Sequence, residues 1–99
     1  MKLLTENILK TFPPLHSQDG KGFESTVYAI FFTPDSDWIW YATEYDPVER
    51  FFFGFVIGFE SEFGYFSLDE LESARGPLGL PIERDLHFEP RPLLEVVRR

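Results

Sequence analysis

Carboxylates are the main side chains through which this chain could do chemistry. Its 99 residues include 17 Asp and Glu, two His and no Cys. Without cysteine there is no thiol nucleophile, no disulfide and no cysteine-type zinc site. The histidines, His16 and His87, fall in a loop and in a predicted edge strand, and a lone histidine of this kind is usually structural. Catalysis or metal binding would therefore depend on the acids.

Two pairs of acids have spacings that resemble known sites. Glu60 and Glu62 share one face of a predicted strand, as the carboxylate pair of a hydrolase could. Asp35 and Asp37 begin like a calcium loop, but Trp38 follows where glycine and further oxygen ligands belong. We interpret both pairs as exposed acids of a strand end and a turn. The sequence thus predicts no catalytic residue, no metal and no cofactor; a metal-dependent hydrolase or nuclease using these acids is an alternative.

Motifs for phosphate or nucleic-acid binding are also missing from the sequence. It contains neither G-x-x-x-x-G-K-[ST] nor G-x-G-x-x-G, and the Gly-Pro-Leu-Gly run at 76–79 is not a phosphate-binding loop. The Trp and Tyr residues of 38–45 could stack on bases, but no basic groove accompanies them. Ser67 fits a helix cap rather than the G-x-S-x-G elbow of a serine nucleophile. We expect no direct binding to nucleic acid.

Turn formers and hydrophobic spacing predict the elements that position these residues. Thr5 is typical of an N-cap, for a helix over 6–11 that the following prolines end. Ser67 opens a capping box for a helix over 68–75, which ends at Gly76. Aromatic and β-branched runs predict further elements: strands at 23–33, 38–45, 51–60 and 63–66, an edge strand at 86–88, and a closing helix at 92–98. The fold class is α+β, an antiparallel β-meander of about four strands with two or three short helices packed on it.

Two stretches of the sequence indicate close packing. Gly54 and Gly58 leave a shallow strip on the predicted strand, where a backbone or a helix can approach closely. Either a helix of this chain or another molecule could fill the strip, and we favour the helix. The Gly/Pro loop at 76–85 is too apolar to extend freely into water, so we expect it to pack on the core. An internal ion pair within 83–85 would hold it there.

Size and composition are those of a small globular protein. A chain of 99 residues buries roughly 60–65% of its unfolded surface, which suffices for one core, so we expect a single domain over 1–99. Hydrophobic residues are 43% and charged residues 26%, which excludes wholesale disorder. The longest apolar run, Phe51–Phe59, is too short for a membrane-spanning helix and the N-terminus lacks a signal-peptide core. We expect a cytoplasmic protein with no membrane contact.

The negative charge is concentrated in the middle of the sequence. The net charge is −8, and from Asp35 to Glu72 there are ten acidic residues and one basic residue, Arg50. Such a charge opposes binding to a phosphate backbone. It keeps a Phe-rich chain soluble, and it could also steer the chain onto a basic surface. Nine of these acids are the predicted partner-binding residues: Asp35, Asp37, Glu44, Asp46, Glu49, Glu60, Glu62, Asp69 and Glu72.

Three segments give the chain a resemblance to a known family. They are LLTENILKTFPPL (3–15), FFTPDSDWIWYATEYD (31–46) and FFGFVIGFESEFGYFSLDELESARGPLGLPIERDLHF (52–88). On these segments the sequence resembles the DUF2958 family, a family of unknown function. The resemblance implies a small protein carried by bacterial plasmids, phages and conjugative elements. It brings no catalytic residues, because the family has none established.

Two functions are consistent with these observations. In the first, the chain is a non-enzymatic interaction module of a mobile genetic element. It would act as an anti-defence inhibitor, of the anti-CRISPR or anti-restriction kind, that mimics DNA and occupies a basic nucleic-acid-binding surface of a host protein or nucleoprotein complex. In the second, the chain is a structural or assembly protein. It would self-associate, for example as a homodimer, or join a plasmid or phage maintenance complex through its apolar strand faces.

Overall fold

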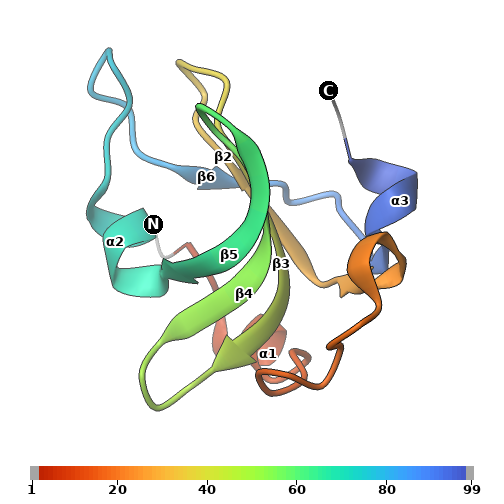
Figure 1. Ribbon diagram of the computed structural model, residues 1–99. Coiled ribbons are helices and arrows are strands. Elements are labelled where there is room, and N and C mark those ends of the chain that lie inside the picture. Colours follow the sequence, from red (N-terminus) through yellow and green to blue (C-terminus); the bar gives the residue numbers. More distant parts are fainter. Residues whose placement is uncertain (1–2, 98–99) are drawn as a thin grey trace.

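A curved antiparallel sheet with short helices around it forms the structure, a computed structural model that describes residues 3–97 (Figure 1). Its main sheet has the strand order β5-β4-β3-β2-β6. The strands are β2 (Ala29–Phe32), β3 (Ile39–Asp46), β4 (Phe51–Ile57), β5 (Ser61–Ser67) and β6 (Glu83–Arg84). The four longer strands are joined in sequence as a meander, so the α+β prediction is confirmed.

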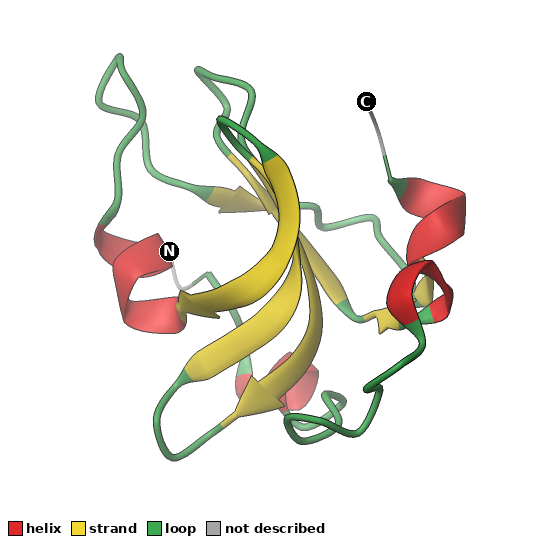
Figure 2. Cartoon of the chain, viewed as in Figure 1, coloured by secondary structure: helices red, strands yellow, loops and turns green. Residues whose placement is uncertain are grey.

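Short elements complete the described part of the chain (Figure 2). A second, two-stranded sheet pairs β1 with β7, also antiparallel. These elements are β1 (Thr26–Val27), β7 (Arg91–Pro92), the helices α1 (Glu6–Leu9), α2 (Leu68–Ser73) and α3 (Leu93–Val96), and the 3-10 helix η1 (Gly22–Glu24). Within residues 3–97 no helix is both long enough and apolar enough to cross a membrane.

Each face of the main sheet carries its own hydrophobic core. The first face presents Phe31, Ala42 and Phe52, which pack with Leu4 from the N-terminal segment and with Leu71 of α2; the remaining members of this core include Leu3, Leu68 and Ile82. The second face presents two buried aromatic residues, Tyr41 and Phe55, which pack with Val27 and Leu93. Successive side chains along a strand point to opposite faces. Because a core covers each face, β3 and β4 carry apolar residues on both sides.

A β-bulge in β3 shapes the centre of the sheet. The pairing of β3 with β4 shifts between Ala42 and Glu44, so that Thr43 is the extra residue. Its hydroxyl donates a hydrogen bond of 3.0 Å to the carbonyl of Phe53. An extra residue reverses the alternation, and Ala42 and Tyr45 therefore belong to the same core. The bulge was not predicted from the sequence.

The glycine strip is filled by strand β3 rather than by a helix. A Cβ atom at Gly54 would collide with the backbone carbonyl of Tyr41, and one at Gly58 would collide with the indole ring of Trp38. Both neighbours belong to β3 or to the turn that leads into it. The prediction of a packed helix at this strip is therefore wrong. The physical requirement for small residues was correct, because the backbone of β3 approaches closely at Gly54 and the indole ring of Trp38 does so at Gly58.

The helix caps agree with the sequence, and the helix ends differ. The Thr5 hydroxyl accepts the backbone N–H of Ile8 at 3.3 Å, and the Ser67 hydroxyl accepts that of Glu70 at 3.2 Å. Helix α1 ends at Leu9 and α2 at Ser73, each two residues earlier than predicted. The closing helix is limited to Leu93–Val96, and the predicted end of this helix at residue 98 lies outside the described residues.

Four predictions about the strands and the loop need correction. The predicted strand over 23–33 is divided into η1, β1 and β2, since the N–H of Ser25 bonds the carbonyl of Gly22 and leaves the chain turned there. The edge strand is β6, not 86–88. Arg84 donates to the carbonyl of Leu3 at 2.8 Å instead of forming an ion pair within 83–85. In the 76–85 loop only Ile82 is buried, and Leu78 is 80% exposed.

Candidate protein-interaction surface

Eight of the nine predicted binding acids are divided between the two ends of the main sheet. Because the strands form a meander, the turns at 33–38 and 58–60 lie at one end, which we call the tip (Figure 1). The turn at 47–50 and the start of α2 lie at the other end, which we call the base. The tip holds Asp35, Asp37, Glu60 and Glu62, and the base holds Asp46, Glu49, Asp69 and Glu72. The acids therefore do not share one surface.

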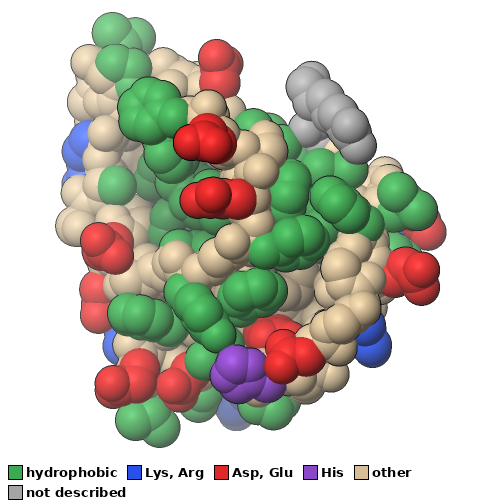
Figure 3. Space-filling view, in the orientation of Figure 1, with side chains coloured by type: hydrophobic (Ala, Val, Ile, Leu, Met, Phe, Trp, Pro, Cys, Tyr) green, Lys and Arg blue, Asp and Glu red, His purple; other side chains and the backbone are tan. Residues whose placement is uncertain are grey.

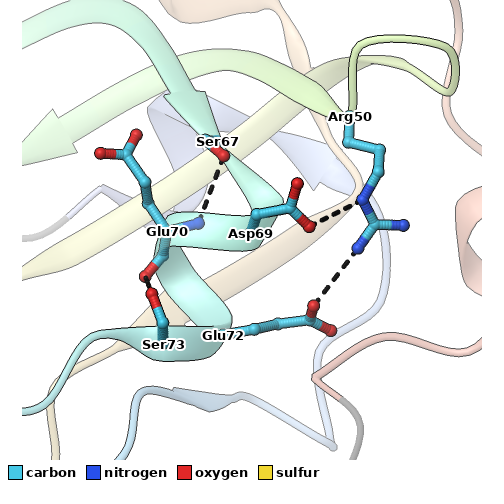
Figure 4. A network of polar contacts seen from close by, with 6 residues as sticks. All are labelled: Arg50, Ser67, Asp69, Glu70, Glu72 and Ser73. Carbon is cyan, nitrogen blue, oxygen red and sulfur yellow. Dashed lines mark hydrogen bonds and ion pairs between the residues drawn. The ribbon is translucent and has the colours of Figure 1, made fainter.

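At the base, Arg50 compensates the acids of α2 (Figure 4). Its Nε lies 2.8 Å from a carboxylate oxygen of Asp69, and a terminal nitrogen lies 3.3 Å from one of Glu72. The hydrogen bond with Asp69 raises the pKa of the Arg50 guanidinium above its usual value. The backbone N–H of Val48 donates to the Asp46 carboxylate at 2.9 Å. Asp46, Asp69 and Glu72 thus stabilise the base and offer less charge to a partner than the sequence suggested.

Glu44 is not on the surface, which corrects its place among the binding acids. The residue is only 2% exposed. Its two carboxylate oxygens accept the backbone N–H groups of His16 at 2.8 Å and of Gln18 at 2.7 Å. The bulge at Thr43 turns Glu44 to the second face, toward the 13–20 loop. A buried carboxylate that is saturated by backbone donors holds a loop in place and cannot steer a partner.

Asp35 is also committed to the chain itself. Its Oδ2 accepts the backbone N–H groups of Leu78 at 2.8 Å and of Leu80 at 3.4 Å. Its Oδ1 is buried and has no hydrogen-bond partner within the described residues. Gly76 is the reason that the carboxylate fits, because a Cβ atom there would overlap it. The prediction that Gly76 ends α2 is therefore wrong, because the helix ends at Ser73. Gly76 instead makes room for the contact that joins the 33–38 turn to the 76–80 loop.

The remaining acids project into solvent. Asp37, Glu49, Glu60 and Glu62 are all exposed, and no ion pair of theirs is found within residues 3–97. Three of the four lie at the tip. In the space-filling view, carboxylates stand beside exposed hydrophobic side chains on the face that is shown (Figure 3). The tip is therefore where uncompensated charge and apolar surface meet.

Aromatic side chains line a groove at the tip, on the first face of the sheet. The ring centroids of Trp38 and Trp40 are 5.7 Å apart, and Phe59 stands edge-on to Trp38 at 5.3 Å. Phe59 is 95% exposed. The groove has a volume of about 400 Å³, and Glu60 and Glu62 are among its lining residues. From the sequence, the tryptophans were assigned to core packing. Phe59, a large apolar residue in the turn at 58–60, was the signal in the sequence that this aromatic cluster extends to the surface.

A second aromatic surface lies on the second face of β4 and β5. In the register of these strands, Phe53 is opposite Tyr65 and Phe55 is opposite Phe63. The rings of Phe55 and Phe63 meet edge-to-face at 5.0 Å, and those of Phe53 and Tyr65 do so at the same distance. Tyr65 is 53% and Phe63 is 37% exposed. Because β5 is the last strand in the sheet order, this surface continues to an edge of the sheet.

The other residues that could do chemistry are not brought together. His16 lies in an exposed loop, with Nδ1 3.2 Å from a carboxylate oxygen of Asp19, while the N–H of His87 donates to Asp85 beyond β6. Within residues 3–97, no group of three or more His, Cys, Asp or Glu is arranged to hold a metal ion. Ser67 is buried and occupied as the cap of α2.

Comparison with known proteins gives a family and no function. No curated protein matches the chain, and no solved structure does. One family of proteins of unknown function matches residues 3–97, which is nearly the whole length of the chain and includes both the tip and the base of the sheet. This protein belongs to the DUF2958 family.

Proposed function

We propose that this protein is a non-enzymatic interaction module of a mobile genetic element, and that its tip binds a basic surface on a host nucleoprotein complex. Occupation of such a surface would inhibit nucleic-acid binding by that complex, as an anti-defence protein does. The observation that supports the proposal is the coincidence at the tip of three uncompensated carboxylates with exposed aromatic rings. Negative charge accelerates encounter with a basic partner, and aromatic rings provide anchoring contacts.

The distribution of basic residues strengthens this proposal. Between Lys21 and Arg50, and again between Arg50 and Arg75, the sequence contains no Lys or Arg. Arg50 itself is engaged at the base with Asp69. Asp37, Glu60 and Glu62 therefore have no lysine or arginine close to them in the sequence, and a charge acts over about 8 Å at physiological salt.

A triple charge reversal tests the proposal. The tagged protein is used to capture partners from a host lysate at low and at high salt, with DNA as competitor. We expect one nucleic-acid-handling complex to be recovered at low salt and lost with Asp37→Lys, Glu60→Lys and Glu62→Lys combined. The matched control combines Glu24→Lys, Glu89→Lys and Glu95→Lys, three exposed acids outside the tip and base. It changes the net charge equally.

The control decides between a local and a general electrostatic effect. Retention of the complex by the control variant, and its loss on addition of DNA, would support binding through the tip. If both triple variants lost the complex equally, or if capture did not depend on salt, the proposed role of the tip would be wrong.

Self-association is the second candidate function, and the register of β5 favours it. Within residues 3–97 no strand pairs with the outer edge of β5, and an exposed aromatic edge strand is a template for another strand. In an antiparallel pair centred on Gly64, Phe63 of one copy would lie opposite Tyr65 of the other. The aromatic pairs of the second face would then continue across the two copies, as in an assembly protein.

A single introduced cysteine tests this pairing, because the chain has no cysteine of its own. Gly64→Cys should form a disulfide-linked dimer on mild oxidation, since residue 64 would face its own copy. The control Ser61→Cys should not, because the two copies of residue 61 would be about 20 Å apart. Equal cross-linking of both variants, or a monomer by sedimentation at high protein concentration, would exclude the β5 pairing.

A further inference from the structure

We propose that the groove at the tip is a binding site for an arginine side chain of the partner. This inference rests on the proposed function and names the chemistry that the tip recognises. Trp38, Trp40 and Phe59 line the groove and are in ring contact through Trp38, and two further aromatic residues also line it. The lining includes two carboxylates, those of Glu60 and Glu62. A guanidinium group stacks on aromatic faces and pairs with carboxylates in a planar fork.

The tryptophans are held in place by the sheet. Trp40 is opposite Val56 in the register of β3 and β4, on the first face. The ring of Trp38 lies against Gly58, where any Cβ atom would strike the indole. The two indoles are tilted by 32° to each other. The aromatic wall is therefore formed before a partner arrives, which reduces the entropy cost of binding.

The charge at the groove has one sign. Glu62 is opposite Val56 across β4 and β5, so it lies on the same face as Trp40. Glu60 follows Phe59 in the turn. None of the described residues that line the groove is a lysine or an arginine. A cation that entered would find carboxylates without a competing base, and a phosphate group would be repelled. This difference favours a basic protein segment over nucleic acid, although bases could also stack on the rings.

Gly64 keeps the groove open. A Cβ atom at this position on β5 would meet no heavy atom within 4 Å. Gly64 also lines the groove, and its backbone is not in the left-handed region. A Cβ atom therefore has room at this position, and we expect the side chain of Gly64→Leu to occupy the groove; circular dichroism checks that the variant folds.

Tryptophan fluorescence reports directly on this groove, because Trp38 and Trp40 are the only two tryptophans of the chain. The probes are three peptides without tryptophan that differ at one position, which is arginine, lysine or citrulline, and a single-stranded oligonucleotide. Citrulline has the shape of arginine without its charge. We expect the arginine peptide to change the fluorescence saturably and to bind at least tenfold more tightly than the citrulline peptide, with lysine between them.

Variants locate the response. Gly64→Leu should abolish saturable binding of the arginine peptide, and Glu62→Gln should weaken it by a factor of about 5–10. The control is Ser61→Leu, at an exposed position of the same strand that does not line the groove. It should bind as the wild type does. Equal binding of arginine and citrulline, stronger binding of the oligonucleotide, or full binding by Gly64→Leu would each overturn the inference.

The same variant separates this inference from the proposed function. If Gly64→Leu still captures the host complex in a salt-dependent manner, and the triple charge reversal does not, then the tip binds a basic surface without using the groove. If the wild-type protein captures no complex at low salt, the proposed function itself is wrong, whatever the peptides show.

Discussion

The carboxylate of Glu44 accepts the backbone N–H of Gln18 at 2.7 Å, 26 positions earlier in the chain. The side chain of Gln18 continues the connection, since its amide nitrogen donates to the carbonyls of Thr26 and Thr43 at 2.9 Å each. Both Glu44 and Gln18 are buried. One carboxylate and one amide therefore fix the 13–20 loop to β3, in a part of the chain that has no regular secondary structure of its own.

Glu44→Ala should destabilise the protein by about 2–4 kcal/mol, because two backbone donors would lose a charged acceptor. The stability of Glu44→Gln should lie between those of the alanine variant and the wild type. Its amide oxygen can still accept one of the two backbone N–H groups, but its NH₂ group then faces the other N–H and cannot accept it. Urea unfolding measures both variants. Glu49→Ala, an exposed acid of the next turn, serves as the control and should change stability by no more than about 0.5 kcal/mol.

The contact between Asp35 and the 76–80 loop predicts a coupled pair of substitutions. Asp35→Ala removes the acceptor of two backbone N–H groups and should cost about 1–2 kcal/mol. Gly76→Ala should displace the same carboxylate by steric overlap and destabilise by a similar amount. Once Asp35 is alanine, Gly76→Ala has little left to displace, so the double variant should be much less destabilised than the sum of the two single variants. Additive effects in this double-mutant cycle would contradict the geometry.

Local signals in the sequence were sufficient for the parts of the fold that local physics determines. The caps at Thr5 and Ser67, the turn at 33–38 and the pattern of the central strands depend on neighbouring residues, and the structure has them. The bulge at Thr43 depends on the partner strand β4, and its consequence is long-range: it decides that Glu44 is buried. The sequence around Glu44, which precedes the buried Tyr45, contains no signal that the carboxylate is buried.

The candidate site shows the same division. The nine acids predicted from the sequence include the four that project into solvent without an ion pair among the described residues, Asp37, Glu49, Glu60 and Glu62. The sequence could not separate these four from acids whose partners lie elsewhere in the chain. Asp69 and Glu72 meet Arg50, which lies about 20 residues earlier. Prediction of the aromatic groove would also have needed the register of three strands. Trp40 of β3 and Glu62 of β5 are each opposite Val56 of β4, and this pairing puts them on the same face of the sheet.

Gly54 and Gly64 are directly opposite each other in the sheet, but substitution by alanine should destabilise the protein only at Gly54. A Cβ atom at Gly54 would strike the carbonyl of Tyr41, which cannot move without breaking the β3–β4 pairing. Gly54→Ala should therefore cost about 3 kcal/mol or more. Gly64→Ala meets open space and should leave the stability within about 0.5 kcal/mol of the wild type. Thermal unfolding of the two variants measures the difference, and similar losses for both would show that the strands pack differently.

Alkaline pH should destabilise the protein through Tyr45. Burial raises the pKa of this phenol, and the nearby charge of Arg50 only partly opposes the effect. The folded state then holds the phenol proton more tightly than the unfolded state does. Its contribution to stability is complete below the usual pKa of about 10 and is lost as the pH rises further. Tyr45→Phe should reduce this dependence when urea unfolding is measured between about pH 9 and about pH 11, roughly one unit on either side of that pKa.

The control for this experiment is Tyr65→Phe, which removes a hydroxyl from a side chain that is 53% exposed. It should keep the alkaline loss of stability seen in the wild type. An unchanged pH dependence in Tyr45→Phe would show that another group controls the alkaline transition.

Arg50 combines a favourable ion pair with an unfavourable backbone, and two substitutions separate these effects. Its φ angle is 59°, in the left-handed region that favours glycine. Both Arg50→Ala and Arg50→Gly remove the contacts with Asp69 and Glu72, but only glycine relieves the backbone. Arg50→Gly should therefore melt about 4 °C higher than Arg50→Ala. Salt distinguishes the two contributions, because ion pairs are screened and a backbone conformation is not. In 1 M salt the Debye length falls to about 3 Å, so the melting temperature of the wild type should fall relative to that of Arg50→Gly. The difference in melting temperature between Arg50→Gly and Arg50→Ala should persist. If that difference disappeared in salt, the backbone at this position would not be strained.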